Sequence, residues 1–374
     1  MIPSQTKTCK LASNGYDQRS KGACCFIKNG WDKFPSPGTV KGYLNSAFIK
    51  EVRHALANGE EHSACEKCWQ DEANGKKSKR IHADVNLDSQ PDGVLTQLSL
   101  FSGNKCNLAC RTCGAHSSTG WFKEHQYILK QTDNFPGVYD KAKIKNFSNK
   151  INVPLDKLQY IEVLGGEPFY ETEHLEFLER VCREADPSKI TLFYSTNGTK
   201  TIEPSIEKMF NKFKNIMISF SIDAVGKRFE YIRTLGVWDQ VEETIAYWKS
   251  RPNVSLKNHA TMSVLNIMYA NEVWKYFTDV HGFENNQIGY TYAIFPPHYN
   301  YSVISNATKT KHMDWILNSL SFGQHTKSIQ SYFKNAEYNE QNFKYFLDAI
   351  KYTNDFRKLD IQDYLPELCK VLDL

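Results

Sequence analysis

Three closely spaced cysteines offer the most distinctive chemistry in this sequence. Cys106, Cys110 and Cys113 lie in the segment CNLACRTC, which directly follows a β-rich run that starts at Val94. A loop with this spacing can wrap three thiolates around a metal cluster. A four-iron cluster with only three thiolate ligands leaves one iron open to a substrate or cofactor. A zinc site completed by a histidine such as His116 is the alternative.

The other cysteines suggest a second metal site. The chain has ten cysteines, eight of them before residue 114, and in a reducing compartment metal binding explains such a concentration better than disulfides do. The remaining two, Cys182 in a helical run and Cys369 near the C-terminus, are expected to be buried as small hydrophobic residues.

The second site is expected before residue 90. Cys65 and Cys68 form a Cys-x-x-Cys pair, a spacing that suits zinc or an iron-sulfur cluster. Cys9 and one of the adjacent residues Cys24 and Cys25 can supply the other thiolates, and we favour Cys24. The preferred interpretation is an iron-sulfur cluster; structural zinc and no metal at all are the alternatives.

Further candidate residues follow later β-rich runs. The segment LGGEPF contains Gly165, Gly166 and Glu167, where paired glycines allow a ligand to approach the backbone and a carboxylate can accept a hydrogen bond from an ammonium group. The next run ends in STNGT, whose Ser195 and Asn197 can bond a ribose. Strand-end turns without a ligand are the alternative for both segments.

A fourth run ends in SFSIDAVGKRFEYIR, which contains Ser221, Asp223 and Arg233. A guanidinium group matches the two oxygens of a carboxylate, so Arg233 is a candidate for binding one. Asp223 is a candidate ligand contact or a turn residue.

The elements that must position these residues alternate between β-rich runs and amphipathic helical patterns, as in a parallel sheet covered by helices. Active sites of barrels lie at the C-terminal ends of the strands, so motifs that follow the strands are expected to converge. The connection after the first run includes TDNFPGVYD and is expected to be an irregular loop. The expected strands start at Val94, Tyr160, Ile190, Asn215, Val254 and Gln287, and the expected helices between them cover about 171–185, 204–213, 238–250 and 270–280.

The expected fold class is therefore α/β, with a partial (β/α)6 TIM-type barrel at residues 91–300. Residues 1–90 form a small cysteine-rich domain with little periodicity beyond a helix at 46–59, and with too few apolar residues for a good core without a metal. Residues 301–374 form a helical C-terminal extension.

The cysteine triad, its place after the first strand and the downstream motifs resemble the radical S-adenosylmethionine (SAM) superfamily over about residues 94–295. The resemblance implies a [4Fe-4S] cluster on the triad, with SAM bound to the open iron. It implies reductive cleavage of SAM to a 5′-deoxyadenosyl radical, which abstracts a hydrogen from the substrate.

The resemblance also implies contacts to SAM. Weaker candidates beside the adenosine are Ser263, Val264 and Asn266, whereas His116 and His259 are expected to be structural. The implied contacts are Gly165, Gly166 and Glu167 to the amino group, Ser195 and Asn197 to the ribose, Ser221 and Arg233 to the carboxylate, and Asp223 to the ribose or the substrate.

The pattern C-x-x-C-W-x-x-E-x-x-G-x-x-S-x-R at residues 65–80 resembles the auxiliary-cluster region of twitch and SPASM radical SAM proteins. Its position before the barrel, without the longer cysteine series of SPASM domains, implies a twitch-like unit with one auxiliary cluster. The implied ligands are Cys9, Cys24, Cys65 and Cys68. The basic residues Lys77, Lys79 and Arg80 are expected to form a solvated linker, or else to pair with an acidic substrate or a redox partner.

Composition limits the other functions. The net charge of +4 gives nucleic-acid binding no support, although a local patch is not excluded. The start MIPSQTKTCK has no apolar core of a signal peptide, and no apolar stretch is long enough to cross a bilayer, so a cytoplasmic protein is expected.

We expect an enzyme that modifies a peptide or protein side chain by radical chemistry, with electrons from a donor such as flavodoxin or ferredoxin. The peptide substrate is inferred from twitch and SPASM relatives, many of which act on peptides. The alternatives are a nucleotide or nucleic-acid base, followed by small sugars or amino acids. An alternative of another class is a non-catalytic binding protein stabilised by metal.

Overall fold

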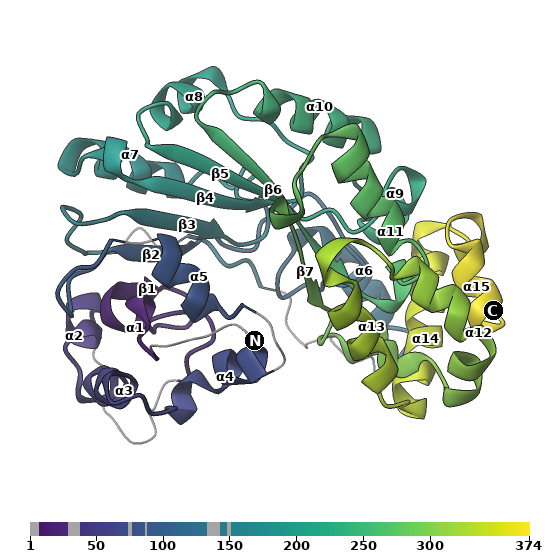
Figure 1. The fold of residues 1–374 in the computed structure, drawn as a ribbon. Coiled ribbons are helices and arrows are strands. Elements are labelled where there is room, and N and C mark those ends of the chain that lie inside the picture. The colour runs from purple at the N-terminus through teal and green to yellow at the C-terminus, as the bar shows by residue number, and fades with distance from the viewer. Residues whose placement is uncertain (1–6, 29–37, 74–76, 87, 133–142, 148–150) are drawn as a thin grey trace.

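A sheet of seven parallel strands forms the centre of the computed structural model, which describes residues 7–28, 38–73, 77–86, 88–132, 143–147 and 151–374 (Figure 1). The strands follow one another in the sheet in chain order, so β1 and β7 are its edges. The sheet curls into a half-barrel. The strands are β1 (Gly15–Asp17), β2 (Gln97–Phe101), β3 (Tyr160–Leu164), β4 (Thr191–Thr196), β5 (Asn215–Phe220), β6 (Val254–Met262) and β7 (Ile288–Tyr292).

Alternation along the strands separates two faces of the sheet. In β4, Leu192 and Tyr194 are buried, whereas Phe193 and Ser195 between them are partly exposed. The buried set faces the outer helices. We call the other side the concave face; in one register row across β2 to β6 it carries Ser99, Glu162, Phe193, Met217 and Ser255.

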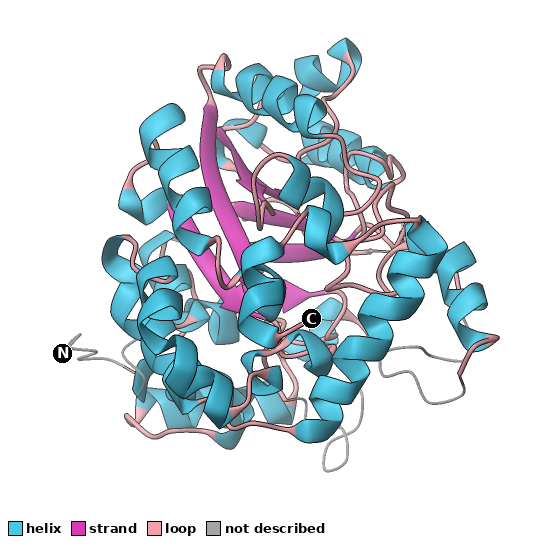
Figure 2. Ribbon diagram, turned by 90° about the vertical axis from the view of Figure 1, so that its right-hand side faces the viewer, coloured by secondary structure: helices cyan, strands magenta, loops and turns pink. Residues whose placement is uncertain are grey.

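Helices on the outer side complete the β/α units (Figures 1 and 2). The most amphipathic of them, α7, buries Phe177, Leu178 and Val181 against the sheet, the three-to-four spacing expected of a helix with one buried face. This layer comprises α6 (Phe122–Leu129), α7 (His174–Glu184), α8 (Pro204–Phe210), α9 (Lys227–Ile232), α10 (Trp238–Lys249) and α11 (Ala270–Lys275), which continues as a π-helix at Tyr276–Val280.

The six predicted strands are present, and β1 is an unpredicted seventh. It comes from the N-terminal segment and pairs with β2 in the register Gly15↔Gln97. Tyr43, Ile49 and Val52 of that segment are completely buried, and their cluster is continuous with the core of the half-barrel. The expectation that the N-terminal residues lack apolar material for a core is therefore wrong. Their helices are α1 (Lys10–Asn14), α2 (Val40–Leu44), α3 (Ala47–Ala57), α4 (Glu66–Ala73) and α5 (Lys79–Asn86).

The C-terminal residues are helical, as expected. Most of the predicted irregular loop TDNFPGVYD lies outside the described residues. Within the described ranges, no helix is both long and apolar enough to span a membrane. The C-terminal helices are α12 (Asn306–Ser319), α13 (Thr326–Asn335), α14 (Glu340–Arg357) and α15 (Pro366–Leu372).

Candidate active site

The cysteine triad lies in the loop that follows β2, at the C-terminal end of the strands. The backbone of this loop is held at both ends: the Cys106 amide donates to Thr119 Oγ1 at 3.1 Å, and the Cys110 carbonyl accepts from Trp121 Nε1 at 2.9 Å. The Cys113 amide closes the turn by donating to the Cys110 carbonyl at 2.9 Å. The loop is therefore ordered by contacts from the segment that leads into α6.

The electrostatics of the three thiols fit cluster ligation. The pKa of Cys106 is raised to about 12, and the pKa of Cys113 is also raised to about 12. In both cases burial is the main cause and the neighbouring Cys110 the second. Three thiolates this close therefore require a compensating cation, which iron supplies. In the described part of the chain, no group of three or more His, Cys, Asp or Glu converges tightly enough for a single metal ion. A four-iron cluster is wider than one ion and binds thiolates that stand farther apart.

The two glycines of LGGEPF pack against the loop that carries the triad. The Gly166 amide donates to the Gly103 carbonyl at 2.8 Å, and the Glu167 amide donates to the Lys105 carbonyl at 2.9 Å. A Cβ on Gly165 would meet Ser102, and one on Gly166 would overlap the Lys105 carbonyl. Both glycines are thus needed for the ends of β2 and β3 to approach each other, whether or not a ligand is bound.

The Glu167 carboxylate connects the ends of β3 and β4. It is completely buried and accepts hydrogen bonds from the Phe169 amide at 3.1 Å, Thr196 Oγ1 at 2.8 Å and the Asn197 amide at 2.7 Å. Burial raises the pKa of Glu167, and these donors oppose the rise. A carboxylate has about four acceptor positions, so one more donor can be accommodated.

Asn197 lies beside the triad, and Ser195 lies beside Ser221 of the segment that follows β5. Asn197 Nδ2 is 3.9 Å from Cys106 Sγ and donates to Asn107 Oδ1 at 2.9 Å. Ser195 Oγ lies 3.4 Å from Ser221 Oγ. The STNGT segment therefore contacts the triad loop through Asn197 and the segment after β5 through Ser195, in line with their positions after consecutive strands.

Arg233 lies between Asp223 and the triad. Its Nη1 is 3.7 Å from Cys110 Sγ, and its Nη2 is 2.7 Å from Asp223 Oδ2. Burial alone lowers the pKa of Arg233, but Asp223 and then Cys110 raise it above its ordinary value. Asp223, also buried, accepts from the Thr261 amide at 2.6 Å. The structure thus gives Asp223 a protein partner, and Arg233 places a cation beside a thiol.

Two of the weaker candidates support Asp223. Asn266 Nδ2 donates to the Asp223 carbonyl at 3.0 Å, and Asn266 Oδ1 accepts from the Ser263 amide at 2.8 Å. Both residues and the neighbouring Val264 are buried. His116, named as a zinc alternative, packs edge-on against Phe295 with ring centroids 6.0 Å apart.

Helix α14 holds the triad loop from the C-terminal end of the chain, a feature that the sequence did not reveal. Arg111, between the second and third cysteines, is fully buried and donates to Thr353 and to Asn354 Oδ1. Arg357 donates to the Ala109 carbonyl at 2.9 Å and pairs with buried Glu124 at 2.8 Å. No local pattern signals these contacts, which join residues more than 230 positions apart.

The N-terminal cysteines Cys24 and Cys25 have different surroundings. The pKa of Cys24 is raised mainly by burial and also by the nearby Cys9. The pKa of Cys65 is raised to about 12, mainly by burial and also by Cys24 and Cys68. Burial also raises the pKa of Cys25, and the charged groups that act on it are Lys79, Glu162, Asp17 and Arg19 rather than Cys9 or Cys65. Cys24 therefore lies among the other N-terminal thiols, and Cys25 faces the sheet. Cys182 packs partly buried against the core, and Cys369 is buried.

Of the basic residues after this motif, Lys77 is exposed as expected, but Lys79 and Arg80 do not belong to a solvated linker. Arg80 is 2% exposed, pairs with Glu72 Oε2 at 2.6 Å and donates to the Thr8 carbonyl at 2.9 Å. Lys79 Nζ pairs with Glu162 of β3 at 3.1 Å. The expectation is wrong because both side chains turn inward, one within the N-terminal unit and the other onto the concave face.

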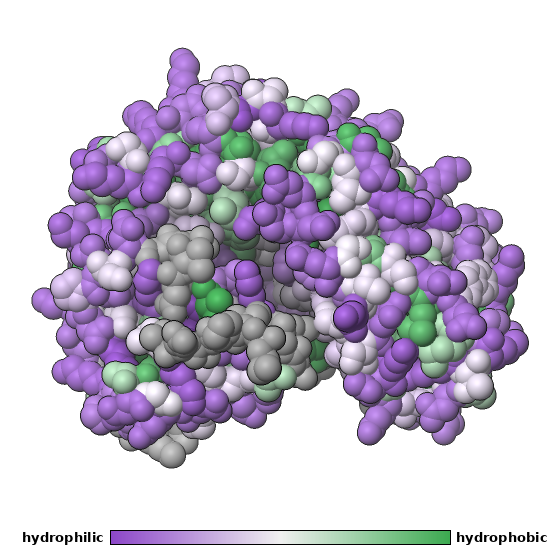
Figure 3. Space-filling model, viewed as in Figure 1, coloured by the Kyte–Doolittle hydropathy of each residue, from purple (hydrophilic) through white to green (hydrophobic). Residues whose placement is uncertain are grey.

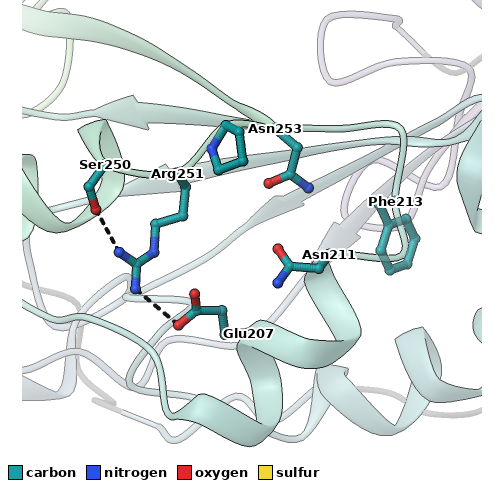
Figure 4. Close-up of a pocket in the computed structure, with 7 residues that line it drawn as sticks. Glu207, Asn211, Phe213, Ser250, Arg251 and Asn253 are labelled. Atoms are coloured by element: carbon teal, nitrogen blue, oxygen red, sulfur yellow. Dashed lines mark hydrogen bonds and ion pairs between the residues drawn. The ribbon is translucent and has the colours of Figure 1, made fainter.

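A surface pocket lies at the opposite end of the sheet. Phe213 lies two residues before β5 and Asn253 directly before β6, and Arg251 there pairs with Glu207 Oε2 at 3.0 Å (Figure 4). The triad motifs follow the ends of the strands, so this pocket is separate from the candidate active site.

The fold and the site together define an α/β half-barrel with a three-thiol loop at the C-terminal ends of its strands. Residues 100–271 match the family model described as the radical SAM superfamily. This match supports an enzyme of the radical SAM class. Comparison with curated protein sequences gave no match.

Two solved structures of proteins with bound SAM have low similarity to this chain. "Native anSMEcpe with bound AdoMet" has a TM-score of 0.37 and 17% identity, and the match covers 55% of this chain and 57% of that one. "Crystal structure of Streptococcus suis SuiB bound to S-adenosylmethionine" has a TM-score of 0.30 and 12% identity, with 72% and 68% covered. The chain thus spans little more than half of the first structure. A TM-score below 0.5 does not establish a shared fold, so the similarity to the radical SAM superfamily rests on the match of residues 100–271.

Proposed function

We propose that this protein is a radical SAM enzyme that cleaves SAM reductively and abstracts a hydrogen from a peptide or protein side chain. The observation that carries the proposal is the meeting of four motifs at one edge of the half-barrel. The triad loop contacts Asn197 through Cys106 and Arg233 through Cys110, and Gly166 and Glu167 pack directly behind it.

The residues fit the implied cofactors. When bound, a [4Fe-4S] cluster and SAM supply an electron and a carbon radical, chemistry that side chains lack. Cys106, Cys110 and Cys113 would hold the cluster, and Arg233 would offset part of the thiolate charge. Glu167 retains acceptor capacity for the SAM ammonium group, and Ser195, Asn197 and Ser221 offer polar atoms for its ribose and carboxylate. Flavodoxin or ferredoxin is the proposed electron donor, and the proposed location is the cytoplasm.

An auxiliary iron-sulfur cluster in the N-terminal unit is part of the proposal. Cys9, Cys24, Cys65 and Cys68 are its proposed ligands, and the unit at residues 1–90 would be twitch-like. The electrostatic coupling of Cys24 to Cys9 and of Cys65 to both Cys24 and Cys68 supports this set over one that uses Cys25. Zinc on the same four thiols is the alternative.

The peptide substrate rests on the resemblance to twitch and SPASM proteins, and a nucleotide or nucleic-acid base is the second candidate. A non-catalytic binding protein would not need an arginine paired with Asp223 and placed beside a cluster thiol. That arrangement, at 2.7 Å and 3.7 Å, therefore favours catalysis over a purely structural metal site.

The test compares the protein with a Cys106→Ala, Cys110→Ala, Cys113→Ala variant after anaerobic reconstitution. We expect the variant to lose the iron of one cluster and to lose SAM binding, measured by equilibrium dialysis. A Cys182→Ala, Cys369→Ala variant removes two thiols elsewhere and should retain both properties. Unchanged iron content and SAM affinity in the triad variant would contradict the proposal.

A further inference from the structure

The concave face carries a pair of basic side chains on β6 that the proposed SAM site does not use. Lys257 and His259 are two residues apart on β6 and therefore point to the same side of the sheet. Lys257 is level with Ser219 of β5, and His259 is level with Gly289 of β7. The alternating neighbours Leu256, Asn258 and Ala260 are buried. Both basic side chains therefore face the concave side, where Figure 3 shows the molecule hollowed at its centre.

Lys257 has no carboxylate partner among the described residues. None of the ion pairs in the described part of the chain includes it, although it is only partly exposed and burial lowers its pKa. The adjoining row carries two acidic side chains. Glu162 of β3 is already neutralised by Lys79 at 3.1 Å and accepts from Ser99 Oγ at 2.6 Å. Asp17 of β1, at the far edge of the sheet from β6, is buried and accepts from the Ser20 amide at 2.7 Å. Within the described ranges, the positive charge of Lys257 is thus left uncompensated.

Other basic side chains surround Lys257 and His259. The His259 ring keeps an exposed surface, yet burial and then His325, His82 and Lys257 lower its pKa to about 4. His82 lies on α5, opposite β6, and its own pKa is lowered by burial, Lys257, Lys77 and Lys79. A Cβ on Gly289 would lie 2.8 Å from His259 Nδ1, so the glycine of β7 leaves room for this ring. All the titratable neighbours named here are basic side chains.

We propose that Lys257 and His259 bind a carboxylate of the substrate on the concave face, and that the substrate is an acidic peptide segment. This inference rests on the proposed radical SAM function with a peptide substrate and makes that substrate more specific. A lysine supplies charge and up to three donors, and a neutral imidazole supplies one N–H donor, a set that suits one or two carboxylate oxygens. His259 thereby acquires a role beyond the structural one expected from the sequence.

The arrangement favours a peptide over a nucleic acid. A nucleic acid presents a phosphate at every nucleotide and is bound by many lysines and arginines along its backbone. On β6 the positive charge comes from a single lysine, and the concave face also carries Glu162 and Phe193. A compact basic group of this size matches an isolated carboxylate.

The experiment measures binding of two dye-labelled peptides to the cluster-loaded protein with SAM, by fluorescence anisotropy. Hexaglutamate is the acidic probe and hexaglutamine its neutral counterpart. We expect hexaglutamate to bind more tightly, and Lys257→Met to weaken its binding by about fivefold or more, as for a partly buried ion pair. Lys257→Arg should retain most of the affinity because it retains the charge.

The matched control is Lys208→Met, which removes the same charge from the exposed outer surface of α8 and should leave hexaglutamate binding unchanged. Iron content and circular dichroism check that each variant is folded. Equal affinity for the two peptides, or an unchanged affinity in Lys257→Met, would overturn the inference. So would preferred, Lys257-dependent binding of a six-nucleotide single-stranded DNA. SAM cleavage by the parent protein is assayed separately, so a failure of the radical SAM proposal would be distinguishable from a failure of this one.

Discussion

Replacing Arg357 with methionine should loosen the loop that carries the cysteine triad. Arg357 is the last residue of α14, and its guanidinium donates to the Ala109 carbonyl, next to Cys110, at 2.9 Å. The same group pairs with Glu124 at 2.8 Å, and the two side chains are only 4% and 3% exposed. Removing the arginine therefore leaves a buried carboxylate without its cation.

The expected loss is about 3–5 kcal/mol in the free energy of unfolding, the usual effect of breaking a buried ion pair from one side. Burial raises the pKa of Glu124, and Arg357 is the main group that opposes the rise. The Glu124 carboxyl group thus holds its proton more tightly in the folded chain than in the unfolded chain. The free energy of unfolding therefore falls as the pH rises from the pKa of Glu124 in the unfolded chain to its pKa in the folded chain. Without Arg357 the folded pKa rises further, and the defect should be larger at neutral than at acidic pH.

Anaerobic urea unfolding measures the stability, and the rate of iron transfer to a chelator reports opening of the cluster loop. Adding Glu124→Gln to Arg357→Met should recover part of the loss, because the stranded charge is gone. Lys344→Met is the matched control: its partner Glu340 is one turn away on the same helix, and both are exposed. Equal stability and iron-release rates for Arg357→Met and Lys344→Met would refute the reasoning.

Three further predictions concern the motifs themselves. Cys24→Ala should lower iron content and Cys25→Ala should not, because only Cys24 is coupled to Cys9 and Cys65; equal iron in the two variants would remove this distinction. Gly166→Ala should impair cluster incorporation, measured by iron and sulfide analysis, because its Cβ would displace the Lys105 carbonyl just before Cys106; normal incorporation would count against this packing argument. Glu167→Ala should weaken SAM binding by about 1–3 kcal/mol with the cluster retained, since the proposed charge-assisted hydrogen bond from the SAM ammonium group is lost; dialysis showing the parent's affinity would exclude Glu167 from the site.

The strands of the half-barrel could be predicted because each is a run of β-rich residues followed by a polar or glycine-containing turn. In β4, the alternation of Leu192 and Tyr194 with Phe193 and Ser195 is itself the pattern of a strand with two different faces. The edge strand β1 is only three residues long, Gly15–Asp17, and is too short to carry a period. Its pairing with β2 depends on contacts of the whole N-terminal segment, which no local pattern encodes.

The site could be predicted in part for a related reason. Motifs after consecutive parallel strands must emerge at the same edge, so Glu167, Asn197 and Ser221 were expected near the triad. Asn197 contacts Cys106 and Glu167, and Ser221 lies beside Ser195 of the same segment as Asn197. The partner of Arg233 was not foreseen, because pairing with Asp223 depends on how the chain turns after β5. The contacts of Arg111 and Arg357 with α14 and Glu124 join distant parts of the chain, and only the folded protein reveals them.

The central claim is that the triad supports reductive cleavage of SAM. The measurement that tests it most directly is anaerobic incubation of the reconstituted protein with SAM and dithionite, followed by chromatography for 5′-deoxyadenosine. The account predicts that 5′-deoxyadenosine and methionine form with dithionite and that neither forms without it. A reduced, cluster-loaded protein that leaves SAM intact would contradict the account.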